Sequence, residues 1–470
     1  MKKRSVPDPF AVLTAPPPGE TAEERAARES QESEARQVSE RIDEQLKQEH
    51  IALLKRHVVR VLLLGQSESG KSTTLKNFRM HYAAEEWKRE RAAWRVVIRL
   101  NLVRSVLTIL AAVQNALDGD SGTQPSLSGI NQVPRSPLSP SSSDDDTDPI
   151  ALTEADAHAH IREPLTRADY VLRTHLVADG AAGILPTADN PEFRIRACDV
   201  HAFLAGGGEE SDVHDVADVL AQYADEITSM WREPNVRRIL QRRGIEMEDN
   251  ASFFVNDIDR IARRDYEPSD DDIVRARLRT MGVQEYRIFP DPTPGNLSSI
   301  GKLRVREWLL YDVGGSRTMR HYWIPYFDNM DAIIFLAPVS CFDERLAEDP
   351  TVNRLEDSVL LWRAVCSSKL LAGTTLVLFL NKVDLLRKKL NRGVQVKRYL
   401  PSYGDRPNET NSFLKYLRTK FRDIERHAST LPRNCSIYTT SVTDTRATAL
   451  TLTTVKDGIL RSHLKTADFI

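Results

Sequence analysis

The sequence predicts an α/β protein: a mostly parallel sheet with helices on both faces, interrupted by an inserted all-helical domain. Three observations lead to this fold class. An apolar run at residues 58–64 (VVRVLLL) enters GQSESGKST, which has the spacing G-x-x-x-x-G-K-[ST] of a phosphate-binding loop, or P-loop. Residues 81–117 then place apolar side chains at helical spacing without an internal glycine or proline. From residue 284 onward, strand-like and helix-like segments alternate, as in parallel sheets covered on both faces.

The individual segments follow from composition and period. Residues 1–19 are rich in proline, and residues 20–57 are rich in Glu, Arg, Gln and Ala with only a thin apolar line. The first stretch is therefore expected to be disordered and the second to be an exposed helix. The strands expected after the helical block are the apolar runs YRIF, RVREWLLYD, DAIIFLAPV, TTLVLFLN and SIYTT.

Two stretches inside the helical block break the helical pattern, and the first has too few apolar residues to fold compactly. The first, rich in Ser, Pro, Asp and Gly, is expected to be a disordered insertion; the second contains the run AGGGEE and is expected to be a further insertion or long irregular loop. The predicted organisation is residues 1–57 for the N-terminal segment, 58–80 for the first part of the sheet domain, 81–272 for the helical domain with an insertion at about 118–150 and a loop at about 178–212, and 273–470 for the second part of the sheet domain.

Bulk composition excludes several classes of protein. The net charge of −2 gives no basic field, so we expect no nucleic-acid partner. The four cysteines include no C-x-x-C pair, which argues against a disulfide framework or a zinc site and fits a reducing compartment. No apolar run approaches the roughly 18 residues that a membrane span needs.

The P-loop predicts binding of a nucleoside triphosphate. Backbone N–H groups of residues 68–72 converge on phosphates in such loops, helped by the N-terminus of the following helix. Lys71 is placed to reach the β- and γ-phosphate oxygens, and Ser72 to bind Mg²⁺. The predicted phosphate-binding residues are Glu68, Ser69, Gly70, Lys71, Ser72 and Thr73.

A second motif selects the base. FLNKVD ends an apolar strand, and the carboxylate of Asp384 can accept two N–H groups from the edge of guanine. Lys382 can lay its aliphatic stem on the ring, and Asn381 completes the pattern N-K-x-D. Four residues alone can be an ordinary turn. After a P-loop, at the carboxyl edge of a sheet where such ligands bind, they favour guanine over adenine.

Two further segments are candidates for the switch chemistry. In YDVGGSR, Asp312 can hold Mg²⁺ through water and Gly315 can donate its N–H to the γ-phosphate, although a glycine turn after a strand is an equally good interpretation. In IVRARLRTMG, Thr280 can bind Mg²⁺ and an arginine can reach the phosphates, although by itself this stretch can also be an ordinary basic loop. The predicted nucleotide-binding residues of this segment are Arg275 and Arg277.

Taken together and in order, these segments resemble the alpha subunit of heterotrimeric G proteins. The matching stretches are LLLGQSESGKST, ASFFVNDIDRIA, DIVRARLRTMG, LLYDVGGSRTMRHYW, LAED, NRLEDSVLLW, FLNKVDLL and TSVTDT. The resemblance extends over residues 58–470 apart from the two insertions. It implies a GTPase domain split by a helical domain that closes over GDP or GTP, with Mg²⁺ as the cofactor.

The resemblance also assigns roles to individual positions. Arg277 matches the built-in arginine finger, so it and Lys71 are expected to act in catalysis. Further nucleotide contacts are implied at Asp249, Asn250, Ser441 and Val442. The segment around Trp323 and the N-terminal helix match surfaces that bind a beta-gamma dimer. The C-terminal helix, with Phe469 and Ile470, matches the end that contacts a seven-helix receptor; the effector remains unidentified.

Two departures from the family fall on the hydrolytic machinery. The motif DVGGQ is DVGGS here, so Ser316 replaces the glutamine that orients the attacking water. The motif GAGES is GQSES, so Ser67 replaces its second glycine. We therefore expect tight GTP binding with slow hydrolysis. The alternatives are a GTPase of normal rate that orients the water by another residue, and a GTP-bound scaffold that scarcely hydrolyses nucleotide.

The lipid signals of the family are a third departure. Lys2 stands where N-myristoylation needs glycine, and no cysteine precedes Cys198. We expect a cytoplasmic protein whose contact with the inner face of the plasma membrane, if any, is peripheral.

Overall fold

The computed structural model describes residues 58–117, 158–177, 210–289 and 307–467, except 246, 248–249, 278–281 and 347, together with 21, 25–26, 30–31 and 33–44. The chain forms two compact units, residues 1–58 and 59–470. In the first unit, residues 33–44 are helical and exposed; Val38 and Ile42 lie one turn apart with about half of their surface accessible.

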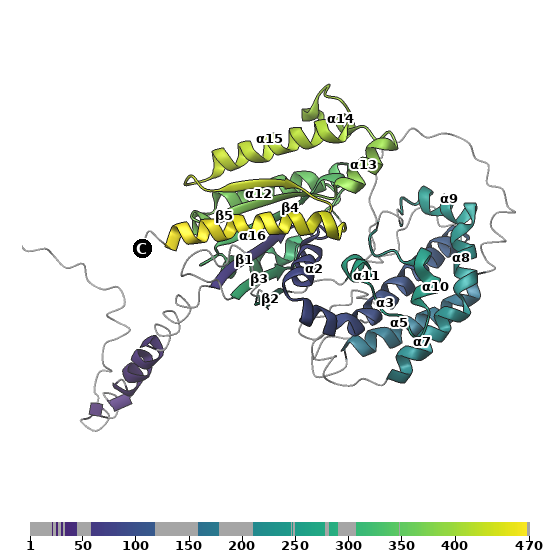
Figure 1. Cartoon of the computed structure of the whole chain (residues 1–470), viewed down its shortest axis with the longest axis horizontal. Helices are drawn as coiled ribbons and strands as arrows, with labels where there is room; N and C mark the ends of the chain where they lie inside the picture. Colours follow the sequence, from purple (N-terminus) through teal and green to yellow (C-terminus); the bar gives the residue numbers. More distant parts are fainter. Residues whose placement is uncertain are drawn as a thin grey trace, which may run out of the picture. The chain divides into compact units, whose positions relative to one another are not determined.

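The second unit contains a six-stranded sheet in the order β2-β3-β1-β4-β5-β6. The pairs β1–β4, β4–β5 and β5–β6 are parallel, and β2 is antiparallel to β3. This arrangement confirms the predicted α/β class (Figure 1). The strands are β1 (Val58–Gly65), β2 (Val283–Ile288), β3 (Glu307–Val313), β4 (Ala332–Pro338), β5 (Thr375–Asn381) and β6 (Cys435–Thr439).

Strand register aligns the ends that carry the sequence motifs. Gly65, the last residue of β1, pairs with Leu336 of β4. Pro338, the last residue of β4, pairs with Asn381, the last residue of β5. Because these strands are parallel, the P-loop after β1 and the N-K-x-D motif after β5 leave the sheet at the same edge.

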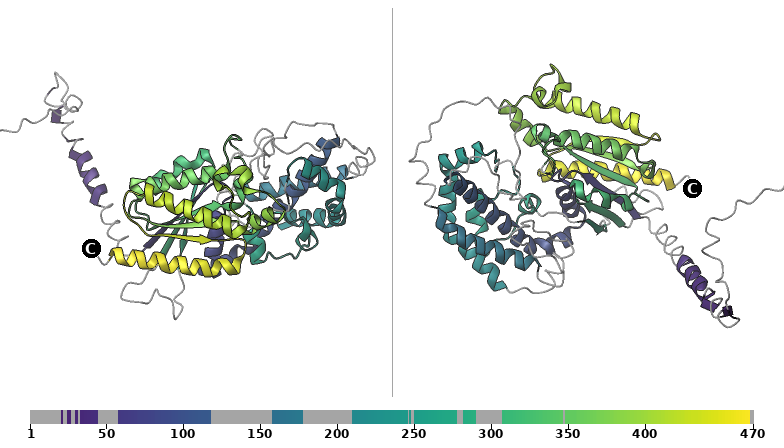
Figure 2. Two further views of the ribbon diagram at one scale, coloured as in Figure 1. Left: turned by 90° about the horizontal axis from the view of Figure 1, so that it is seen from above. Right: turned by 180° about the vertical axis from the view of Figure 1, so that it is seen from behind.

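Helices cover both faces of the sheet (Figure 2). On one face, α2 (Lys71–Tyr82) and α16 (Thr445–Ala467) pack in a common apolar cluster with β1, β3, β4 and β5. On the other face lie α12 (Arg354–Ser367) and α15 (Thr410–Ala428), where Trp362 stacks edge-on against Phe335 of β4 and donates its indole N–H to Phe421 O. The double cover explains why β4 and β5 read as nearly continuous apolar runs.

The remaining elements of this part are short. They are η4 (Arg317–Tyr326), η5 (Val339–Asp343), η6 (Lys369–Leu371), α13 (Val383–Asn391), α14 (Val396–Tyr399) and η7 (Pro401–Tyr403).

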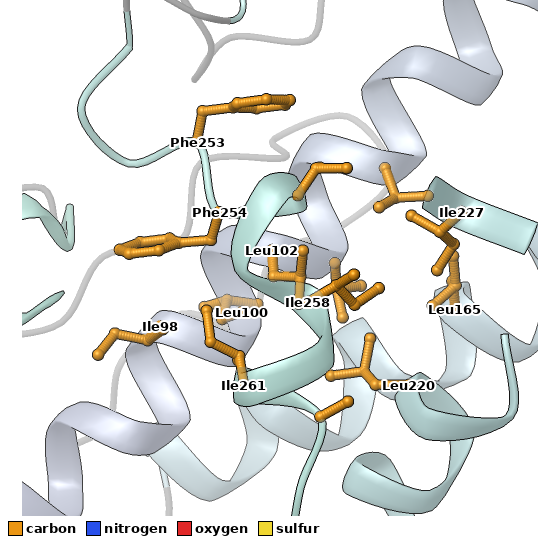
Figure 3. Packing of buried hydrophobic residues seen from close by; sticks show 14 of the residues in the cluster. Ile98, Leu100, Leu102, Leu165, Leu220, Ile227, Phe253, Phe254, Ile258 and Ile261 are labelled. Carbon is orange, nitrogen blue, oxygen red and sulfur yellow. The ribbon is translucent and has the colours of Figure 1, made fainter. Parts of the chain in front are cut away.

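The helical part has its own apolar core. The elements are α3 (Ala84–Leu117), η1 (Ala159–Ile161), α5 (Arg162–Val177), α7 (Glu210–Gln222), α8 (Ala224–Arg232), α9 (Pro234–Arg242), η2 (Val255–Asp257), α10 (Ile258–Ile261) and α11 (Asp270–Arg275). Figure 3 shows Ile258 and Ile261 of α10 packed beside Leu100 and Leu102 of α3. The insertion predicted at residues 118–150 lies outside the described residues, as do positions 178–209, and α7 already begins inside the loop predicted to run to residue 212.

The long helix α3 is rich in apolar residues. Among the described residues, it is the one helix long and apolar enough to cross a membrane by length and composition alone, which the sequence prediction overlooked. In the structure 83% of that apolar window is buried inside the protein. Leu100, Leu102 and Val103 belong to the core of the helical part, so packing against neighbouring helices accounts for their character.

His158, just before η1, connects two other segments of the helical part through its imidazole ring. His158 Nδ1 lies 3.2 Å from Glu226 of α8, and Nε2 lies 2.8 Å from Glu233, which precedes α9. His160 contacts the same Glu226. Burial alone would lower the pKa of His158, but hydrogen bonds and charges from Glu233 and Glu226 outweigh it, so the pKa is raised.

Replacing His158 by glutamine should therefore destabilise the protein in a pH-dependent way. A raised pKa in the folded state means that the stabilisation is fully present below the unfolded pKa and disappears as the pH rises through the folded pKa. We expect H158Q to lower Tm by roughly 2 °C at pH 5.5–6 and by less at pH 8.5. The measurement is thermal unfolding against pH, and an equal loss at both pH values would contradict the prediction. H427Q, at an exposed histidine in the last turn of α15, is the control.

Candidate functional site

The P-loop begins with a backbone geometry that two glycines make possible. Gly65 has φ 143° and Gly70 has φ 105°. A Cβ atom on Gly65 would lie 2.5 Å from Leu336 O, and one on Gly70 would lie 2.4 Å from Asn381 Nδ2. Glycine is therefore required at both positions, by conformation and by space. The loop that results lies between the end of β1 and the first turn of α2.

Lys71, the first residue of α2, is directed back into this loop. Its Nζ donates hydrogen bonds to Gly65 O at 2.9 Å and to Gln66 O at 2.7 Å. Burial and the neighbouring Arg320 lower the pKa of Lys71, Asp312 opposes them, and the result is about 8. The loop carbonyls thus hold the ammonium group at the predicted phosphate-binding position.

The predicted Mg²⁺ ligands from two elements come together. Ser72 Oγ on α2 donates a 2.6 Å hydrogen bond to Asp312 Oδ2, and Asp312 is buried near the end of β3. A hydroxyl and a carboxylate are hard oxygen donors of the kind that Mg²⁺ prefers, so the residues fit this ion. Thr280, the third predicted ligand, lies outside the described residues.

Asn381 connects the base-recognition loops to the P-loop. Its Nδ2 donates to Ser69 O at 2.8 Å, and its Oδ1 accepts from Thr440 Oγ1 at 3.1 Å and from Val442 N at 3.2 Å. Ser441 Oγ accepts a 3.1 Å bond from the backbone N–H of Asp384. The side-chain amide of Asn381 thus forms hydrogen bonds with three protein groups and connects these loops to each other.

The other two residues of the motif remain placed for a ligand. Lys382 adopts the left-handed conformation, φ 65°, just before α13, and burial and Arg354 lower its pKa. Asp384 lies in the first turn of α13. Within the described residues its carboxylate has no hydrogen-bond or ion-pair partner, so both oxygens can accept N–H groups of a guanine.

Arg277 is held at the P-loop by two elements. Its guanidinium forms an ion pair and hydrogen bond with Glu68. Its backbone is clamped by Asn101 of α3, which accepts from Arg277 N at 2.7 Å and donates to Arg277 O at 3.0 Å. Burial would raise the pKa of Glu68, but Arg277, Arg354 and Lys382 outweigh burial and lower it to about 2. Glu68 is therefore ionised and keeps Arg277 beside the loop.

Two predicted nucleotide contacts, Arg275 and Asn250, have their described contacts within the helical part. Arg275 donates to Ala251 O and Phe253 O and lies over the ring of Phe254, all within the helical part. Asn250 caps its own turn by accepting from Ser252. Asp249 lies outside the described residues. The two predicted arginines are thus separated: Arg277 is held at the P-loop by Glu68, and Arg275 is held within the helical part.

The segment after β3 lies directly against the P-loop. A Cβ atom on Gly315 would lie 2.4 Å from both Gln66 C and Ser67 N, so this glycine packs on the loop backbone. Ser316 immediately precedes η4, and its hydroxyl lies 3.3 Å from Thr318 Oγ1. Trp323 is buried and donates its indole N–H to Gly314 O at 2.9 Å.

Several positioning residues were missed by sequence reasoning. Lys76 of α2 donates to Ile273 O and Ala276 O, just before Arg277. The only sequence signal for Asn101 was a polar side chain in a largely apolar helix, which does not identify a partner, and Lys76 lies in a helix of mostly polar residues. Gln66, within the loop, differs from the alanine of the family motif GAGES, but nothing in the sequence indicates its partner Arg354 at the start of α12.

Comparison with known proteins agrees with this geometry. The family described as G-alpha, G-protein alpha subunit, matches residues 36–459. The guanine nucleotide-binding protein alpha-4 subunit of Mycosarcoma maydis is 29% identical, covering 97% of this chain and 95% of the relative. The alpha-2 subunit of Neurospora crassa is 27% identical over 91% of this chain and 94% of its own, and an alpha subunit of Cochliobolus heterostrophus is 28% identical over 94% and 98%. The chain therefore belongs to the G-protein alpha subunit family, whose members are guanine nucleotide-binding signal transducers.

Proposed function

We propose that this alpha subunit is a GDP/GTP switch in receptor-coupled signalling and that it hydrolyses GTP slowly. In this proposal the residues around Thr280 and Gly315 are ordered when a γ-phosphate is bound and released when it is lost. Slow hydrolysis then prolongs the GTP-bound form. The observation that carries the rate proposal is Ser316, because its position is where the family has a glutamine.

Ser316 is too short for the role of that glutamine. In GTPases of this kind the side-chain amide orients the water that attacks the γ-phosphate. The Ser316 hydroxyl is two heavy-atom links shorter and lies next to Thr318 Oγ1. Ser67 adds a side chain on the loop residue against which Gly315 packs. Both changes act where the water and Arg277 must assemble, which supports a reduced rate.

The proposed binding functions rest on the phosphate, Mg²⁺ and guanine motifs of the sequence. Lys71 and the loop N–H groups would hold the phosphates, and Ser72, Thr280 and, through water, Asp312 would hold Mg²⁺, which neutralises charge on the β- and γ-oxygens when bound. Arg277 would move from Glu68 to the γ-phosphate, a short transfer because Glu68 is itself a loop residue. Asp384 would select guanine.

The partner surfaces belong to the proposal as well. The N-terminal helix would offer Val38 and Ile42 to a beta-gamma dimer. In the second predicted surface, Trp323 is buried, so its exposed neighbours Tyr322 and Ile324 would make the contact. The helix α16 would face a receptor, together with Phe469 and Ile470, which lie outside the described residues.

Single-turnover hydrolysis tests the rate proposal. The protein is preloaded with GTP, Mg²⁺ is added, and phosphate release is followed for the wild type, S67G, S316Q and the double variant. We expect the double variant to be about a hundredfold faster, because a gain of about 3 kcal/mol in transition-state stabilisation corresponds to that factor. Equal binding of a non-hydrolysable GTP analogue by all four proteins is the control.

Each other outcome has a definite meaning. Brisk hydrolysis by the wild type would overturn the slow-switch proposal and show that another group orients the water. Failure of the double variant to accelerate would show that Ser67 and Ser316 do not limit the rate. A wild type that binds GTP and releases no phosphate over many hours, even after the nucleotide is exchanged, would favour a GTP-bound scaffold.

A further inference from the structure

Gln66 makes a connection away from the phosphates that the fold alone does not require. Its side chain is 1% exposed and points to the start of α12. There Nε2 donates to Arg354 O at 2.6 Å and to Asp357 Oδ2 at 2.5 Å. The orientation of the amide is determined chemically, because the reverse orientation would direct its carbonyl oxygen at two acceptors. The family motif GAGES has alanine at this position, which has no group to donate.

Asp357 is shared between the P-loop and the segment after Gly315. Arg320 donates to it with both terminal nitrogens, NH1 to Oδ1 at 2.9 Å and NH2 to Oδ2 at 2.6 Å. Both side chains of this pair are largely buried, so the fork geometry is protected from solvent. Asp357 Oδ2 therefore accepts from Gln66 and Arg320 at once, and it links a P-loop side chain to η4.

The helix that carries Asp357 is firmly anchored to the same loop. Its N-cap is Asn353, whose side chain accepts from two backbone N–H groups of the first turn. Arg354 donates through NH2 to Ser67 O at 3.0 Å and lies 3.7 Å from Glu68. The first turn of α12 thus contacts three consecutive P-loop residues, the side chain of Gln66, the carbonyl of Ser67 and the carboxylate of Glu68.

We propose that Gln66 is a positioning residue that, through Asp357, fixes Arg320 and so holds the segment from Gly314 to Arg320 against the P-loop. The segment is then held by contacts within the protein in addition to any contact with a γ-phosphate. Its order should depend less on the bound nucleotide than in an alpha subunit with alanine at this position. The inference rests on the proposed switch role of this segment but not on the rate of hydrolysis.

The test uses Trp323 as a reporter in the GDP-bound protein. The indole of Trp323 donates to Gly314 O, so its environment follows the segment. The full chain is labelled with 5-fluorotryptophan, and the Trp323 resonance among the six tryptophans is assigned with W323F. Two variants are compared with the wild type: Q66A, which has the residue of the family motif, and Q66M, which keeps the length but cannot donate.

We expect both variants to shift or broaden the Trp323 signal while the signals of Trp231 and Trp362 stay in place. Hydrogen exchange of the amides from 314 to 320 should become about tenfold faster, the effect of losing a buried hydrogen bond to a charged group. In an R320Q background, Q66A should add nothing, because the connection to the segment is already cut. Q395A, an exposed glutamine before α14, is the matched control.

Three results would overturn the inference. They are an unchanged Trp323 signal and exchange rate in both variants, an effect of Q66A that is as large with R320Q as without it, and a general shift of all tryptophan signals in Q66A and Q66M alike, which would indicate a merely structural role. Because every readout is taken with GDP bound, fast hydrolysis by the wild type would overturn the proposed function and leave this inference intact.

Discussion

Replacement of Arg277 by alanine is expected to slow single-turnover GTP hydrolysis by about 10³-fold or more, the effect of losing an arginine finger. The guanidinium lies at the P-loop through Glu68, and Asn101 fixes the backbone that carries it. The negative charge that develops on the phosphoryl oxygens in the transition state would no longer be stabilised by this guanidinium. The measurement is phosphate release from preloaded protein, made in the S67G/S316Q background so that the rate is easily followed.

Two other arginines provide the comparison. R275A removes a guanidinium of the same type two residues away, which the structure places on Ala251 O and Phe253 O. R287A removes an exposed arginine of β2 that pairs with Glu285. If R275A lowered the rate of phosphate release as much as R277A does, the arginine finger would have been assigned to the wrong residue. If R287A also lowered the rate of phosphate release, the assay would be responding to the loss of positive charge in general.

The second large effect is expected from D384N. The Asp384 carboxylate has both oxygens available for the two N–H groups on the edge of guanine. Its loss should weaken GTP binding by about a hundredfold, since two charge-assisted hydrogen bonds contribute on the order of 3 kcal/mol. Xanthosine triphosphate has a carbonyl group where guanine has its amino group, and it should bind to D384N more tightly than it binds to the wild type. Equilibrium binding of both nucleotides measures the change.

The matched control is D405N, which alters an exposed aspartate paired with Lys397. It should leave both affinities as they are. If D384N bound GTP as tightly as the wild type, Asp384 would not be the guanine ligand. If D384N bound neither nucleotide, the substitution would have disturbed the loop itself, including the hydrogen bond from Asp384 N to Ser441 Oγ.

The amino-acid sequence by itself determined the fold class and the chemistry of the motifs. Strand β1, the P-loop and α2 are continuous in the chain, so apolar pattern, glycine positions and Lys71 could be read locally. The same holds for β5 followed by Asn381 and Asp384. Such features can be inferred locally because the period of a strand, the start of a helix and the conformation of a glycine depend on a few neighbouring residues.

Only the tertiary structure decided which residues position that chemistry. Arg275 and Arg277 were both predicted to contact the nucleotide, and contacts with Phe253 and Asn101 separate them. Asn101 is 176 residues from Arg277, and Gln66 is 291 residues from Asp357. A side chain's role at such separations depends on the direction in which the packed elements hold it and on whether a partner lies within hydrogen-bond distance, and neither is present in the local pattern of the chain.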